Sequence, residues 1–313
     1  MHVCAHPTAA DFLDRAGAFL SRSPVANQLL LAIARNAVER PTAYGGQFRG
    51  YSVAANASPD AAVLSAAVHT APWPAQVAEG DADAAAALGA YFAQLPEPLP
   101  GIGGPDVSAD AFAAAYASAR DARIVPDHAL GVFELRTIDT PPSWRPKGPR
   151  EGPSAPSPIA PQRRAEGRRI LADVAHAPLL QLWLQAFHDE ATPSDPAPAA
   201  DSGARMASNG RTWLWLAPDE TPAAFVYNGR RFDGWASLGP VYTPPDLRGR
   251  GYATTLVTDT SAELLAQGFH CTLFTHLANP TSNAIYERIG YRRVGTARRL
   301  DFIHAPPEMQ TES

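Results

Sequence analysis

The sequence has few cysteines, no long basic run and no long apolar run, and each absence excludes a class of protein. Its two cysteines, Cys4 and Cys271, lie far apart and form no CxxC pair, so we expect neither a disulfide framework nor a metal site. A formal net charge of -5 offers no broad basic surface for nucleic acid. No run approaches the ~18 apolar residues of a membrane span, and residues 1–7 lack a signal-peptide pattern. We therefore expect a cytoplasmic protein with no nucleic acid and no membrane among its partners.

Length and proline content indicate two domains. The chain has 313 residues, about twice the ~150 of a typical domain, and 45% of them are hydrophobic. Prolines gather between Thr140 and Pro161, where neither a helix nor a central strand can form because proline lacks the N–H. We predict an N-terminal domain at 1–140, a proline-rich linker at 141–164 and a C-terminal domain at 165–313.

The N-terminal half has the pattern of a mixed α/β domain without a catalytic motif. Apolar periodicity and capping residues predict its helices and strands. The helices are expected at 9–20, 24–40, 81–95 and 108–119, and the strands at 50–55, 62–69 and 132–138.

The C-terminal half contains a glycine-bearing loop between a predicted strand and a predicted helix. We expect one long strand at Gly234–Tyr242 and a helix at Tyr252–Gln267. Gly249 and Gly251 lie between them, where they let the backbone approach a ligand, and the N–H groups of the helix start favour an anion such as a diphosphate. The alternative is a tight turn that needs glycine for its dihedral angles alone. P-loop and dinucleotide-binding patterns fit this loop poorly.

Two motifs resemble those of one acetyltransferase superfamily. Arg248-x-x-Gly251-x-Ala253 is similar to the Arg/Gln-x-x-Gly-x-Gly/Ala signature of the GNAT superfamily. A second segment, Asn279 to Tyr291, is similar to the family's Asn-x-x-Ala/Ser-x-x-Leu/Ile-Tyr-x-x-x-Gly-Phe/Tyr. The resemblance covers roughly 168–303. It implies an acyl-CoA N-acyltransferase (GNAT) fold, a mixed α/β sheet, in the C-terminal half and a degenerate GNAT-like domain in the N-terminal half.

The resemblance also implies a cofactor and the residues that hold it. Acetyl-CoA would be the cofactor, and its acetyl group would pass directly to an amine. A main-chain N–H near Val241 would polarise the thioester carbonyl. The residues implied to contact the cofactor are Val241, Tyr242, Thr243, Arg248, Gly249, Arg250, Gly251, Tyr252, Ala253, Thr254, Asn279, Asn283 and Tyr286.

Two residues are predicted to move protons. The motif position of Tyr286 implies that its hydroxyl protonates the departing thiolate, whereas its alternative role is that of a packed aromatic residue. His276 is our candidate general base because its ordinary pKa lies near neutrality, and its alternative is an exposed loop histidine. Asp233 and Glu220 remain further candidates for the base.

Three functions remain open at this point. The favoured one is an acetyl-CoA-dependent N-acetyltransferase acting on a small-molecule or peptide amine. The alternatives are a non-catalytic acyl-CoA sensor or scaffold and a transferase with a different acyl donor. The sequence specifies neither the acceptor nor the oligomeric state. We assign Cys271 no chemistry, since it falls on a strand expected to be buried.

Overall fold

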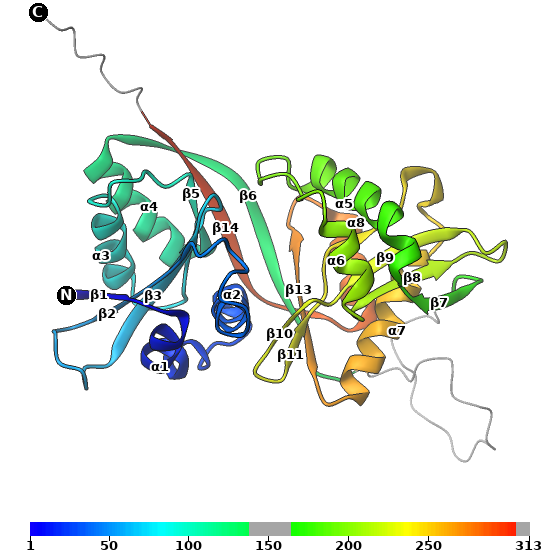
Figure 1. Cartoon of the computed structure of the whole chain (residues 1–313), viewed down its shortest axis with the longest axis horizontal. Coiled ribbons are helices and arrows are strands. Elements are labelled where there is room, and N and C mark those ends of the chain that lie inside the picture. Colours follow the sequence, from blue (N-terminus) through cyan, green and yellow to red (C-terminus); the bar gives the residue numbers. More distant parts are fainter. Residues whose placement is uncertain (138–163, 305–313) are drawn as a thin grey trace, which may run out of the picture. The chain divides into compact units, whose positions relative to one another are not determined.

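The computed structural model of the chain describes residues 1–137 and 164–304 (Figure 1). Their contacts divide them into two compact units. The first unit comprises Met1–Val132, His276–Ala278 and the chain from Gly295 on, and the second comprises the described parts of Phe133–Thr275 and Asn279–Val294. This division differs from the boundaries predicted at 1–140 and 165–313, because the last strand contributes residues to both units. The predicted linker at 141–164 lies outside the described residues apart from Arg164.

The first unit is a mixed sheet with helices between its strands. Its sheet order is β1-β2-β3-β4-β5-β14-β6, and only the β4–β5 pair among the first five strands is parallel. The bounds are β1 His2–His6, α1 Ala9–Leu20, α2 Gln28–Glu39, β2 Phe48–Ala54, β3 Val63–Thr70, β4 Ala75–Val77, α3 Ala82–Phe92, β5 Gly101–Pro105, α4 Asp106–Arg120, β6 Ala122–Leu135 and β14 Arg292–His304.

Helices α3 and α4 lie side by side in the first unit (Figure 1) because a glycine allows their close approach. A Cβ on Gly89 would lie 2.2 Å from the carbonyl oxygen of Phe112, which leaves room for no side chain. Around this contact the core buries Phe92, Phe112 and Tyr116 completely.

The second unit has two sheets. One, in the order β12-β9-β8-β7, is antiparallel, and β6-β13-β11-β10 are consecutive in the other, where β11 and β13 run parallel. Figure 1 shows α5 beside α6, where the N–H of Gly203 donates to the side chain of Gln181. The bounds are β7 Arg168–Leu171, the 3-10 helix η1 Val174–His176, α5 Ala177–Ala191, α6 Ser202–Ser208, β8 Thr212–Leu216, β9 Pro222–Tyr227, β10 Arg230–Phe232, β11 Trp235–Ser237, β12 Val241–Tyr242, the 3-10 helix η2 Pro245–Leu247, α7 Tyr252–Ala266, β13 His270–His276 and α8 Pro280–Ile289.

The two halves of the chain, β1 to β6 and β7 to β14, follow the same order of elements. Each half has a strand, two helices and a run of strands, followed by helix, strand, helix and strand, and the second half adds β10 and β11 before the strand β12. The mixed α/β class predicted from the sequence is confirmed. Within 1–137 and 164–304, no helix combines the length and the apolar character needed to cross a membrane.

Candidate functional site

The two sheets of the second unit separate at Leu238 and Gly239. The N–H of Leu238 donates to the carbonyl of Thr272 in β13, whereas the N–H of Gly239 donates to the carbonyl of Tyr227 at the end of β9, each at 2.8 Å. Gly239 has a φ of +148°, which side chains rarely adopt, so glycine permits this change of partner. The prediction of one long strand at 234–242 is therefore wrong: β11 and β12 belong to different sheets.

Strand β12 forms an edge of its four-stranded sheet. Val241 pairs with Val226 and Tyr242 with Phe225, and no strand in the described part of the chain pairs with the other side of β12. The ring of Tyr242 packs near Trp183 with centroids 6.2 Å apart, so only the backbone of Tyr242 can meet a ligand. An unpaired strand edge can receive an extended ligand that carries amide groups.

The loop after β12 contains two glycines in left-handed conformations. Gly249 has a φ of +77° and Gly251 a φ of +83°. A Cβ on Gly249 would meet nothing within 4 Å, so the backbone there is open to an approaching group. Both glycines are thus needed for their dihedral angles, as the turn alternative proposed, and Gly249 also leaves the exposed backbone that the ligand hypothesis requires.

Helix α7 starts directly from this loop without a side-chain cap. Gly251 is its N-cap and has no side chain, so the first-turn N–H groups at Tyr252, Ala253 and Thr254 receive no capping hydrogen bond. These groups carry the partial positive charge of a helix N-terminus and favour a bound anion. Tyr252 is 9% exposed and packs in the core, so it offers its backbone alone. The open backbone at Gly249 and the uncapped start of α7 fit a diphosphate.

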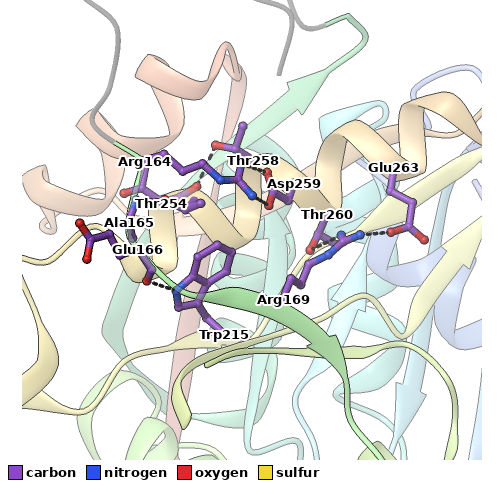
Figure 2. Close-up of polar contacts among 11 residues, drawn as sticks. Arg164, Ala165, Glu166, Arg169, Trp215, Thr254, Thr258, Asp259, Thr260 and Glu263 are labelled. Atoms are coloured by element: carbon purple, nitrogen blue, oxygen red, sulfur yellow. Dashed lines mark hydrogen bonds and ion pairs between the residues drawn. The ribbon is translucent and has the colours of Figure 1, made fainter. Parts of the chain in front are cut away.

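A short segment before β7 clamps helix α7 in place (Figure 2). Arg164 forms a two-pronged ion pair with Asp259, and the N–H of Ala165 donates to the hydroxyl of Thr255 at 3.0 Å. Farther along, Arg169 pairs with Glu263. These contacts lie along α7, so they fix the helix whose first turn forms the candidate anion site.

The side chains of Arg248 and Arg250 turn back onto their own loop. Arg248 Nε donates to the carbonyl of Thr243 at 2.9 Å, and its Nη2 pairs with Glu190 at 2.6 Å. Arg250 donates to the carbonyl of Asp246 at 3.2 Å. Both arginine side chains therefore stabilise the conformation of the loop, while the backbone between them stays exposed.

Tyr286 lies on α8 and packs against the same core as Val241. Its ring meets that of Tyr291 edge to face, with centroids 5.9 Å apart, and the residue is only partly buried. Desolvation raises the pKa of Tyr286 to about 12. A hydroxyl with this pKa stays protonated at neutral pH and can act as an acid but not as a base. Packing and acid chemistry are thus compatible at this residue.

The two asparagines lie at the start of α8. The side chain of Asn279 accepts a hydrogen bond from the N–H of Ser282 at 3.0 Å, which makes Asn279 the N-cap. Asn283 follows one turn later, and its N–H donates to the carbonyl of Asn279. Capping is therefore an observed role of Asn279, and contact of either asparagine with a cofactor stays a prediction.

His276 belongs to the first unit, whereas the other predicted site residues belong to the second. Its ring stacks on that of His128, with centroids 4.7 Å apart, and His128 Nδ1 lies 2.8 Å from Asp127. Burial and then His128 lower the pKa of His276. Of the other candidate bases, Glu220 is exposed and paired with Arg168, which lowers its pKa and makes it a poor base.

Cys271 is fully buried on β13, as the sequence predicts. Desolvation raises the pKa of its thiol to about 12, so the group is inert near pH 7. Among the described residues, no three side chains of His, Cys, Asp or Glu come together as a metal site.

Sequence reasoning missed two features of this site. One is the separation of the sheets at Gly239-Pro240, although a proline within a predicted strand is a signal against a central strand. The other is Glu190, which lies 58 residues before Arg248 and has no local signal of its contact.

The comparisons with known proteins bear on the same segment. Residues 226–300 match the family model described as FR47-like protein. This range contains β12, the glycine loop, α7 and α8. No curated protein matches the sequence.

Several solved structures share the fold over the whole chain. A Drosophila protein of structural genomics origin has a TM-score of 0.64 at 15% identity, covering 96% of this chain and 98% of its own. A GCN5-related N-acetyltransferase from Sphaerobacter thermophilus has a TM-score of 0.57 at 16% identity, covering 99% and 98%. A tandem GNAT protein from the clavulanic acid biosynthesis pathway has 0.56 at 15%, covering 98% and 100%. At these identities the similarity establishes the fold: a tandem GNAT architecture.

Proposed function

We propose that the second unit is an acetyl-CoA-dependent N-acetyltransferase of the GNAT superfamily, because residues 226–300 match the FR47-like model and the fold is similar to that of a tandem GNAT protein. One observation carries the proposal. The unpaired edge of β12 leads directly into the open glycine loop and the uncapped start of α7. An edge for an amide-bearing arm, followed by a cradle for a diphosphate, matches the chemical layout of coenzyme A.

The residues divide the binding task between them. The backbone of Val241–Thr243 would pair with the pantetheine arm, and the backbone from Arg248 to Thr254 would receive the diphosphate. Tyr242 and Tyr252 would take part through their main chains alone, because their side chains lie in the core. Bound acetyl-CoA supplies an acetyl group activated as a thioester.

The proposed reaction needs three things from the protein. An N–H near Val241 stabilises the charge on the thioester oxygen while the amine nitrogen forms its bond to the carbonyl carbon, an interaction worth ~3 kcal/mol in comparable sites. Tyr286 gives its proton to the sulfur as the C–S bond breaks, and solvent reprotonates the hydroxyl. The amine also loses one proton to a base. His276, the candidate taken from the sequence, belongs to the first unit, so we assign it no role at this site. The acceptor is proposed to be a small-molecule or peptide amine in the cytoplasm.

Calorimetric titration of the full chain with acetyl-CoA is the first experiment. We expect saturation near one equivalent per chain, with NAD as a control that does not bind. No binding would overturn the proposal, and two equivalents would assign a second site to the first unit. Thiol release with a panel of amines then separates an enzyme from a sensor, since a sensor would bind acetyl-CoA and release no CoA with any amine.

A further inference from the structure

Three residues of the second unit form a contact that joins helix α5 to the glycine loop. Arg248 Nη2 lies 2.6 Å from the carboxylate of Glu190, and Arg248 Nε donates to the carbonyl of Thr243 at 2.9 Å. We call Glu190, Thr243 and Arg248 the latch. Thr243 directly follows β12 and Arg248 precedes Gly249, so the latch spans the base of the loop that carries the candidate diphosphate site.

The position of Glu190 does not stabilise helix α5. The residue lies in the last turn of α5, where a negative charge opposes the partial negative charge of the helix C-terminus. Burial of Leu180 and Trp183, not Glu190, holds α5 against the core that also contains Tyr242. The side chain of Glu190 pairs instead with Arg248.

The latch balances the charge of the loop. The hydrogen bond to Glu190 raises the pKa of the Arg248 guanidinium, whereas burial lowers it. The effect of Glu190 is the larger, so the pKa is raised. A carboxylate at 2.6 Å cancels the positive charge that Arg248 would otherwise offer to an incoming diphosphate. The side chains of Arg248 and Glu190 are 43% and 52% exposed, and ion pairs with such exposure are weak and readily exchanged.

We propose that Glu190 competes with the diphosphate of acetyl-CoA for Arg248, and thereby sets how tightly the loop holds acetyl-CoA and how fast it releases CoA. The inference rests on the proposed function, because it takes the glycine loop as the diphosphate site. Glu190 is a positioning residue in this scheme, since it acts through Arg248.

The test compares Glu190→Gln with the wild type by titration with CoA at about 50 mM and about 300 mM salt. Glutamine keeps an oxygen that accepts a hydrogen bond from Arg248 and removes the charge. We expect Glu190→Gln to bind CoA about 3- to 10-fold more tightly at low salt and the gain to shrink at high salt. Equal or weaker binding would overturn the inference.

Two further variants separate competition from a general charge effect. Glu220→Gln removes the same charge from an exposed ion pair with Arg168 in the same unit and should leave CoA binding unchanged. In an Arg248→Met background the gain from Glu190→Gln should largely disappear. An undiminished gain there would mean that Glu190 acts on the ligand directly and would refute the competition. If the wild type fails to bind CoA, the proposed function falls and the latch with it, whereas binding by the wild type with an unchanged Glu190→Gln refutes the latch alone.

Discussion

The two halves of the chain follow one order of elements, yet the two units differ where the second unit has its candidate cofactor site. In the first unit β4 pairs with β5, with Ala75 opposite Ile102 and Gln76 opposite Gly103. In the second unit the corresponding strands, β12 and β13, belong to different sheets. In the first unit β5 thus pairs with β4, whereas the corresponding edge of β12 in the second unit stays unpaired.

The helices that follow these strands start in opposite ways. Asp81 caps α3 by accepting a hydrogen bond from the N–H of Ala84 at 2.9 Å, and Asp83 adds a second carboxylate in the first turn. Helix α7 starts from Gly251 with no side-chain cap. The start of α3 is therefore stabilised by its own carboxylates, which repel an anion, whereas α7 leaves its N–H groups to a ligand. In the first unit the protein itself satisfies the N–H groups of the helix start and of the strand edge, whereas in the second unit these groups are left for a ligand. We therefore expect that the first unit binds no acetyl-CoA.

The largest expected effect comes from adding a side chain to the glycine loop. Gly251→Val should lower the affinity for acetyl-CoA by ~100-fold or more, because valine opposes the φ of +83° and its side chain crowds the exposed backbone. Titration calorimetry measures the loss. Gly210→Val is the matched control, since Gly210 has a φ of +68° with open space around it and lies between α6 and β8. Equal binding losses in both variants would mean that strain, not the cradle, is responsible.

The next effect concerns two tyrosines on helices that correspond in the two units. Tyr286→Phe should lower turnover ~100-fold with little change in acetyl-CoA affinity, because it removes the proposed acid. Tyr116 on α4 instead accepts a hydrogen bond from the buried N–H of Leu99 at 2.8 Å. Tyr116→Phe should cost about 1–3 kcal/mol of unfolding free energy and leave turnover unchanged. Steady-state kinetics measure turnover and urea unfolding measures stability for both variants. Wild-type turnover in Tyr286→Phe would mean that Tyr286 only packs in the core and donates no proton.

A smaller effect is expected at alkaline pH from the core of the second unit. The pKa of Cys271 is about 12 in the fold against an ordinary value of 9.0, so the folded state favours the neutral thiol. Its contribution to stability is complete below pH 9 and is lost as pH rises toward 12, by about 1.4 kcal/mol per pH unit. Cys271→Ala should make the fall of unfolding free energy above pH 9 less steep by that amount. Cys4→Ala is the control, since Cys4 is exposed, and equal slopes in all three proteins would contradict the expectation.

The smallest effect tests the closed helix start of the first unit. Asp81→Ala should cost ~1 kcal/mol of unfolding free energy because α3 loses its cap, whereas Asp81→Asn keeps a capping oxygen and should cost less. Neither change should create a second binding site for acetyl-CoA, because the β4–β5 pairing still closes the edge. A second equivalent of acetyl-CoA bound by Asp81→Asn would mean that the negative charge of Asp81 alone prevents the first unit from binding acetyl-CoA.

Local signals in the sequence determined much of this protein. The helix at 9–20 was predicted with the observed bounds, and the helix predicted at 252–267 ends one residue later than α7. Gly249 and Gly251 marked the loop because glycine alone adopts its dihedral angles at no cost. Such features depend on neighbours in sequence, so periodicity and residue type are sufficient to find them.

Only the tertiary structure decided which elements pair. Whether a strand is an edge depends on a partner far away in sequence, as with Gly239, whose N–H turns to Tyr227 and starts the separation of β12 from β13. The pair of Arg248 with Glu190 depends in the same way on how α5 packs against its sheet. The sequence by itself therefore determined the loop and its glycines, while long-range packing and hydrogen bonding decided that the edge beside the loop is open.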